Sequence, residues 1–97
     1  MQYPYVGWKN QGGTDDRNAP GGSWRVYWQS KTDEKWPDTC CVLGCVRRAT
    51  EGAHMYCPAV DRSEYIIPSC HYHNMQYNAV YNLKHTLRSL VSANTNK

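Results

Sequence analysis

The chain has 97 residues, which is enough for one small domain. Only 40% of its residues are apolar, Phe is absent, and the expected hydrophobic core is thin. The net charge of +3, from 11 basic and 8 acidic residues, is compatible with nucleic acid as a partner. No apolar stretch is long enough to cross a membrane, and the amino terminus has no secretory signal pattern. We therefore expect a small cytoplasmic protein without a membrane partner.

The first 22 residues are expected to form a flexible N-terminal arm. Residues 11–22 are rich in Gly, Asp, Asn and Pro and show no hydrophobic period, as is typical of loops. The aromatic residues just before them, Tyr3, Tyr5 and Trp8, offer apolar surface that can pack onto the domain. Residues 23–97 are then expected to form the single folded domain.

The first predicted element of that domain is a strand over Ser23–Ser30. Trp24, Val26 and Trp28 alternate with other residues and would line one face of a strand. A charged loop over residues 31–38 follows, and it leads into the first cluster of cysteines.

Two clusters of Cys and His have the layout of a structural zinc site. The first offers Cys40 and Cys45, or alternatively Cys41 and Cys45, and the second offers Cys70 and His73. About two dozen residues separate the clusters, and two close pairs with such a gap are typical of zinc sites. Zinc prefers four sulfur or nitrogen ligands at the corners of a tetrahedron.

The alternatives to zinc are disulfides or a set of buried free thiols. The five cysteines are an odd number, so disulfides alone would leave one thiol over. Disulfides are also rare in a reducing cytoplasm, where clustered Cys and His more often bind metal. A structural zinc ion contributes on the order of 10 kcal/mol to folding, which would offset the thin core.

A β-hairpin and a long helix are predicted after the first cluster. Residues 47–56 and 64–67 read as two extended segments joined by a loop. Ser69 is a suitable N-cap for a helix over residues 70–92. That helix would have one apolar face, made of Val80, Leu83, Leu87, Leu90 and Val91. A zinc turn, a hairpin and a C-terminal helix in this order predict an α+β fold of the treble-clef type, extended by the N-terminal strand and loop.

Two stretches of the chain resemble zinc-containing HNH endonuclease domains. Residues 40–54, Cys-Cys-Val-Leu-Gly-Cys-Val-Arg-Arg-Ala-Thr-Glu-Gly-Ala-His, resemble the start of such domains. There, a C-x4-C pair with Gly before the second Cys leads to a strand that ends in the catalytic His. Residues 66–74, Ile-Ile-Pro-Ser-Cys-His-Tyr-His-Asn, resemble their closing segment. The resemblance covers about residues 40–78 and implies a metal-dependent endonuclease.

The resemblance also implies the four zinc ligands. Cys40, Cys45, Cys70 and His73 match the family's structural ligands, and Cys40 is favoured over Cys41 because the family pattern is C-x4-C.

The resemblance implies catalytic roles for two further residues. His54 matches the general base, and Asn74 matches the last motif position, where family members carry His or Asn. Such a nuclease uses a neutral imidazole to activate water, and a cation such as Mg²⁺ or Mn²⁺ at the scissile phosphate. The central Asn of the motif is missing, because Glu64 and Tyr65 stand in its place, and Ala53 replaces the acidic residue that often precedes the His. These departures weaken the positioning of the base and the binding of the cation.

Basic and aromatic residues of the hairpin and helix are expected to contact DNA or RNA, since cations bind phosphates and Tyr rings stack on bases. They are Arg47, Arg48, Arg62, Tyr77, Tyr81, Lys84 and Arg88. Each has a plainer alternative, because exposed arginines and tyrosines often only cover a solvated edge.

Three classes of function are compatible with the sequence. The first is a metal-dependent nuclease with His54 as base, although a lone His on a strand is often only a packing residue. The second is a non-catalytic zinc module that binds nucleic acid. The third is a protein-binding module, for example a regulatory protein of a phage or mobile element, that docks a partner through exposed Trp and Tyr.

Overall fold

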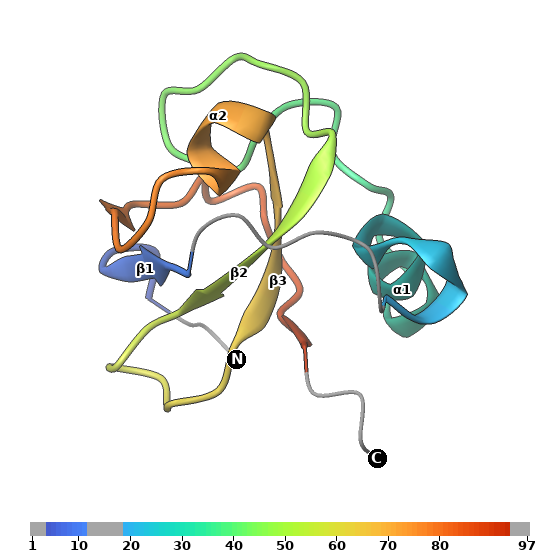
Figure 1. Cartoon of the computed structure of the whole chain (residues 1–97), viewed down its shortest axis with the longest axis horizontal. Helices are drawn as coiled ribbons and strands as arrows, with labels where there is room; N and C mark the ends of the chain where they lie inside the picture. Colours follow the sequence, from blue (N-terminus) through green and yellow to red (C-terminus); the bar gives the residue numbers. More distant parts are fainter. Residues whose placement is uncertain (1–3, 12–18, 94–97) are drawn as a thin grey trace.

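The computed structural model describes residues 4–11 and 19–93. Within these residues a five-stranded antiparallel sheet, with strand order β4-β1-β2-β3-β5, lies between two α-helices (Figure 1). The strands are β1 (Trp8–Asn10), β2 (Glu51–Tyr56), β3 (Tyr65–Ser69), β4 (Val80–Tyr81) and β5 (Val91–Ser92). The helices are η1 (Pro20–Gly22), α1 (Trp24–Lys31) and α2 (His71–Asn74). The protein is therefore a compact α+β domain, as the sequence predicts.

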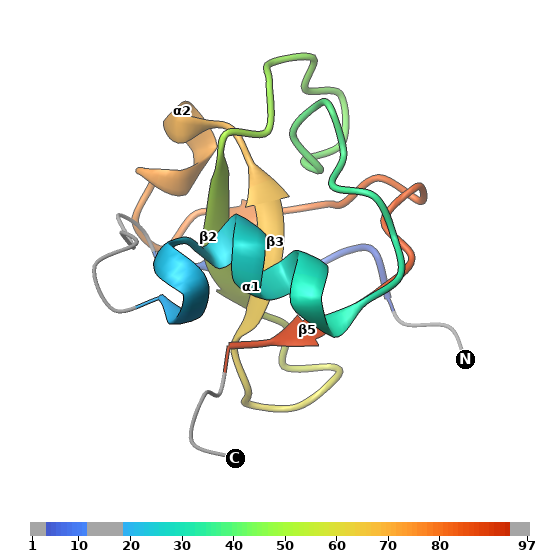
Figure 2. The ribbon, with the colours of Figure 1, turned by 90° about the vertical axis from the view of Figure 1, so that its right-hand side faces the viewer.

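The hairpin of β2 and β3 is the centre of the fold, and its prediction is confirmed. The two strands pair antiparallel, with His54 opposite Ile66. Successive side chains of a strand point to opposite faces, so Gly52 and His54 face one side of the hairpin and Glu51 faces the other. Helix α1 lies across the first side and α2 across the second (Figures 1 and 2). A Cβ at Gly52 would lie 2.7 Å from the Cβ of Trp24, so only Gly allows α1 to pack this closely.

The predicted strand over Ser23–Ser30 is wrong, because this segment forms α1. The Ser23 side chain caps the helix and accepts a hydrogen bond from the backbone N–H of Val26 at 3.0 Å. Trp24, Tyr27 and Trp28 then share one buried face. Short apolar runs can satisfy both a two-residue and a helical period, and here the helical spacing and the cap decide.

The predicted helix over residues 70–92 is also wrong, because α2 ends after one turn. Asn78, four residues beyond the end of α2, has a φ of 59°, a left-handed conformation that a helix continuing through this position could not contain. The side chain of Asn10, which is fully buried in β1, shares its N–H groups among three carbonyl oxygens at this end of α2. These are the oxygens of His73, Asn74 and Gln76, at 2.9, 3.0 and 2.9 Å. Carbonyls that a longer helix would satisfy internally are satisfied by Asn10 instead.

The remainder of the predicted helix wraps around the sheet as β4, β5 and connecting coil. Leu83, Leu87 and Val91 are buried as expected, but Val80 is 62% exposed. Leu83 pairs with Val42 in an isolated bridge, and β5 pairs with β3. The apolar spacing therefore marks burial against the core and not a helical face.

The hydrophobic core contains all four tryptophans. Trp8, Trp24, Trp28 and Trp36 are each 7% exposed or less, so the expectation that they are available to a partner is wrong. Trp28 packs edge-to-face on Trp36, with 5.5 Å between ring centroids. Aromatic pairs of this kind add to the stabilisation that burial provides.

The segment expected to be an arm contributes β1 to the sheet, where it pairs with both β2 and β4. Residues 1–3, with Tyr3, and residues 12–18 of that segment lie outside the described residues. None of the helices that the structure describes is long and apolar enough to cross a membrane.

Candidate metal centre

A tight turn between Cys40 and Cys45 supplies the first two sulfur atoms. The N–H of Cys40 donates to the carbonyl of Arg47 at 2.8 Å, and the N–H of Cys45 donates to the carbonyl of Val42 at 3.0 Å. Gly44 has a φ of +85°, which a residue with a side chain rarely adopts. The turn therefore brings together two thiols that are separated by four residues. We call residues 40–45 the zinc knuckle.

The start of α2 supplies the other two donors. Cys70 is the N-cap of the helix, and its Sγ accepts a hydrogen bond from the backbone N–H of His73 at 3.4 Å. A spacing of three residues places both side chains on the same face of one helical turn. Strand β3 ends just before Cys70, so the hairpin sets the position of this pair.

The four predicted ligands converge. One donor atom from each of Cys40, Cys45, Cys70 and His73 lies within 4.8 Å of the others. The Sγ atoms of Cys45 and Cys70 are 3.9 Å apart, and the His73 Nδ1 lies 3.2 Å and 3.5 Å from the sulfurs of Cys70 and Cys40. Zinc bonds of about 2.3 Å to sulfur and about 2.1 Å to nitrogen place such atoms about 3.5–3.8 Å apart in a tetrahedron. The cluster has the composition and spacing to hold a structural metal ion such as zinc.

Burial shapes the protonation of these ligands. It raises the pKa of the Cys40 thiol to about 11, and nearby Cys70 and Cys45 add to this effect. Burial also acts to raise the pKa of Cys45, but hydrogen bonds from Arg47 and the neighbouring thiols outweigh it and leave this pKa lowered. Burial lowers the pKa of His73, and the positive charge of Arg47 lowers it further. His73 is therefore neutral near pH 7, as a metal ligand must be, and a bound cation would deprotonate the thiols.

The two remaining cysteines lie outside the cluster. Cys41 lies within the knuckle and is buried, but it is not one of the four converging donors. Its backbone N–H donates to the carbonyl of Pro68 and its carbonyl accepts from the N–H of Lys84. Burial raises the pKa of its thiol to about 12. Cys57 lies at the opposite end of β2, where its Sγ donates to the carbonyl of Val6 at 3.6 Å. All five cysteines are free, so the disulfide alternative finds no support.

His54 faces α1. Its ring packs edge-to-face on Trp24, with 4.5 Å between centroids, and its Nδ1 lies 3.3 Å from a carboxylate oxygen of Glu64. Only 12% of the His54 side chain is exposed. The residue that occupies the place of the missing motif Asn is therefore in contact with the candidate base.

Asn74 faces the other side of the hairpin and is 1% exposed. Its side chain donates to a carboxylate oxygen of Glu51 at 2.6 Å, and His71 Nδ1 lies 2.5 Å from the other oxygen of Glu51. Glu51 and His54 are three positions apart on β2 and so point to opposite faces. The structure does not bring His54 and Asn74 together.

Two of the predicted nucleic-acid residues lie beside the metal centre. The Arg47 guanidinium stands over the ring of Tyr72, 5.0 Å from its centroid. Tyr81 packs edge-to-face on His73 at 4.9 Å. Tyr72 is 54% exposed and is not among the residues that the sequence predicts at this surface, although it stands between the candidate ligands Cys70 and His73.

The other predicted contacts do not form one patch. The ammonium group of Lys84 is hydrogen-bonded within the protein. Its Nζ donates to the carbonyl of Cys45 at 2.5 Å and to the hydroxyl of Thr39 at 3.1 Å. Arg48 lines a cavity near α1, together with Arg25. Arg62 lies in the loop at the far end of the hairpin from the knuckle (Figure 1). Tyr77 and Arg88 are exposed, after α2 and before β5 respectively.

Comparison with known proteins finds no family model, no curated protein and no solved structure that matches the chain.

Proposed function

We propose that the protein is a zinc-stabilised module of the treble-clef type. The observation that carries this proposal is the convergence of four Cys and His donor atoms within 4.8 Å. Two donors come from the knuckle and two from the first turn of α2, with the β2–β3 hairpin between them in the chain. This order of turn, hairpin and helix is the one that defines the treble clef. The helix here is short, with only four residues.

We further propose that the surface beside the metal centre binds single-stranded DNA or RNA. A hollow of about 530 Å³ lies there, lined by knuckle residues together with Arg47 and His73. Leu43 and Val46 are 59% and 86% exposed at its rim, and Tyr72 is exposed nearby. Proteins that bind single strands combine apolar and aromatic platforms for bases with cations for phosphates. We call Leu43, Val46, Arg47 and Tyr72 the knuckle face.

A non-catalytic role is favoured over an endonuclease. A nuclease of the HNH type needs its base and its cation ligand at one phosphate, whereas His54 and Asn74 point to opposite faces of the hairpin. Asn74 is also buried against Glu51. If nicking of supercoiled plasmid in Mg²⁺ or Mn²⁺ occurs and is lost in His54→Ala protein of equal zinc content, the endonuclease assignment is restored.

The test of binding is fluorescence anisotropy with labelled single-stranded oligonucleotides and zinc-loaded protein. Tyr72→Ala and Arg47→Gln should each weaken binding, because base stacking and phosphate contacts each contribute about 1–3 kcal/mol. Arg62→Gln is the matched control, since it removes the same charge at the far end of the hairpin. Affinity should also fall with rising salt. No binding at low salt by folded, zinc-loaded protein would contradict the proposal and favour a protein partner.

A further inference from the structure

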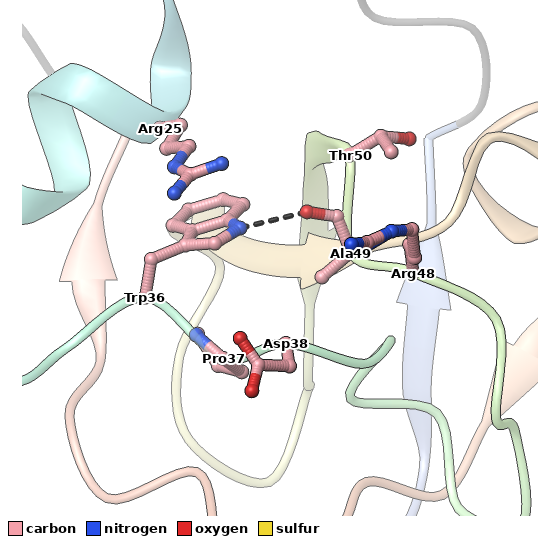
Figure 3. Close-up of a pocket in the computed structure, with 7 residues that line it drawn as sticks. All are labelled: Arg25, Trp36, Pro37, Asp38, Arg48, Ala49 and Thr50. Carbon is pink, nitrogen blue, oxygen red and sulfur yellow. Dashed lines mark hydrogen bonds between the residues drawn. The ribbon is translucent and has the colours of Figure 1, made fainter.

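A second hollow lies on the α1 side of the hairpin, away from the knuckle face (Figure 3). Its volume is about 320 Å³, at the small end of the range for ligand sites. It is lined by Arg25, Trp36, Pro37, Asp38, Arg48, Ala49 and Thr50. The lining comes from three parts of the chain: helix α1, the loop before the knuckle and the segment that leads into β2.

The walls of this cavity are held by the fold. Trp36 is 3% exposed, and its indole N–H donates to the carbonyl of Ala49 at 2.7 Å. The N–H of Ala49 donates to the carbonyl of Asp38 at 3.1 Å, and Thr39 pairs with Arg48 in an isolated bridge. Two short segments that lead to and from the knuckle therefore form a rigid back wall.

Two guanidinium groups border the cavity. The Arg25 guanidinium stands over the Trp36 ring, 5.5 Å from its centroid, and Arg48 lies across from it (Figure 3). Contact with the face of an indole holds a guanidinium in place while its N–H groups stay available as donors. Neither arginine forms an ion pair with any residue that the structure describes. The site thus offers two cations, one of them held over Trp36, and no carboxylate among the described residues pairs with either.

We propose that this cavity binds a phosphate monoester. The paired N–H groups of a guanidinium match the oxygens of a phosphate in geometry and charge. The hydroxyl of Thr50 at the rim is a further hydrogen-bond donor. Arg25 and Arg48 outweigh the one carboxylate of the lining, Asp38, so a dianion gains net attraction. The volume suits a group the size of a small organic phosphate. Such a group could come from a free mononucleotide or from the end of a nucleic-acid strand.

This site is independent of the proposed knuckle face, because the two arginines that follow the knuckle point to different sides. Arg47 lies over Tyr72 of α2, whereas Arg48 lines the cavity beside α1. Loss of one binding activity is therefore not expected to remove the other.

The test is isothermal titration calorimetry of zinc-loaded protein with a nucleoside 5′-monophosphate, the same nucleoside without phosphate, and inorganic phosphate. The monophosphate should bind and the nucleoside should not. Arg25→Gln and Arg48→Gln should each weaken binding about tenfold or more, since charge-assisted hydrogen bonds are lost. Arg62→Gln is the matched control and should bind as the wild type does. Circular dichroism and zinc content establish that the variants are folded.

Asp38→Asn gives a test with the opposite sign. Removing this carboxylate should tighten phosphate binding several-fold, because like charges in one site repel. Weaker binding by Asp38→Asn would show that the carboxylate assists the ligand instead of repelling it, and would overturn the proposal. Equal binding of nucleoside and monophosphate, no binding of either phosphate, or an equal loss in Arg62→Gln would overturn it as well.

Oligonucleotides distinguish the two sources of the phosphate. Tighter binding of a 5′-phosphorylated strand than of its 5′-hydroxyl form, lost in Arg48→Gln, would assign the cavity to a strand end. Equal binding of both forms, together with monophosphate binding, would assign it to a free small molecule. Either result supports a phosphate site.

Discussion

The two sides of the β2–β3 hairpin are stabilised in different ways. On the α2 side, side-chain donors from the knuckle and from one helical turn converge on a site that could hold a metal ion. On the α1 side, Trp24, Tyr27 and Trp28 pack on the sheet, with Trp36 against Trp28. A four-residue helix cannot bury enough apolar surface to hold itself in place, whereas an eight-residue helix with three buried aromatic residues can. A metal ion at the candidate site would stabilise the α2 side, where the helix is too short to be stabilised by packing alone.

The largest expected effect is unfolding of the α2 side of the hairpin when one of the candidate metal ligands is removed. Cys70→Ser or Cys45→Ser should leave the chain largely unfolded, because the binding free energy of a structural zinc ion, about 10 kcal/mol or more, is also folding free energy. Circular dichroism and zinc analysis of the purified variants measure this.

Cys57→Ser is the control, since Cys57 is equally buried but lies at the other end of β2. It should remain folded and retain zinc. If Cys57→Ser unfolds while Cys70→Ser does not, the assigned ligand set is wrong.

The second effect concerns the α1 side. Trp28→Ala should destabilise the protein by about 3–5 kcal/mol, because it opens a large cavity between α1, Trp36 and the sheet. Urea unfolding of the zinc-loaded protein gives the change in free energy. Val26→Ala, on the exposed face of the same helix, should cost far less. Equal costs at the two positions would show that α1 is not held by its buried aromatic face.

The third effect tests the contact between Asn10 of β1 and the end of α2, on the α2 side of the hairpin. Asn10→Ala removes the amide that satisfies three carbonyls at the end of α2 and should cost about 1–3 kcal/mol. Because α2 carries Cys70 and His73, the variant should also bind zinc more weakly, as a competition titration with a chelator would show. Asn82→Ala, at an exposed position, is the control. Unchanged stability in Asn10→Ala would mean that α2 ends at Asn74 for another reason.

The sequence predicts the metal side better than the α1 side. The four ligands are two close pairs at a turn and at a helix start, and local spacing predicts them except for the choice between Cys40 and Cys41. The resemblance to zinc-containing HNH domains implies Cys40. The hairpin between them follows from two extended segments with a loop. None of these features depends on what the rest of the chain packs against.

The errors arise where distant residues decide the local structure. The period of Leu83, Leu87 and Val91 indicates burial correctly, but Asn10, from a segment expected to be an arm, helps to end the helix after one turn. Likewise, alternation of Trp24 and Trp28 suggests a strand, whereas the Ser23 cap and the position of Tyr27 fit a helix. Burial was predicted for Leu83, Leu87 and Val91, whereas Trp24 and Trp28 were expected to be available to a partner. The element type is wrong in both cases.

The smallest effect separates the two proposed binding sites. Arg47 and Arg48 are neighbours in the chain, yet Arg47 stands over Tyr72 on the metal side and Arg48 lines the cavity with Arg25. Arg47→Gln should weaken binding of a 5′-hydroxyl oligonucleotide about tenfold and leave monophosphate binding unchanged, because one charge-assisted contact is lost. Arg48→Gln should do the reverse. Each variant is the control for the other, since both remove one positive charge at adjacent positions. If both variants weaken both ligands equally, the arginines act on one shared surface through net charge alone, and the separation of the two sides fails as an account of binding.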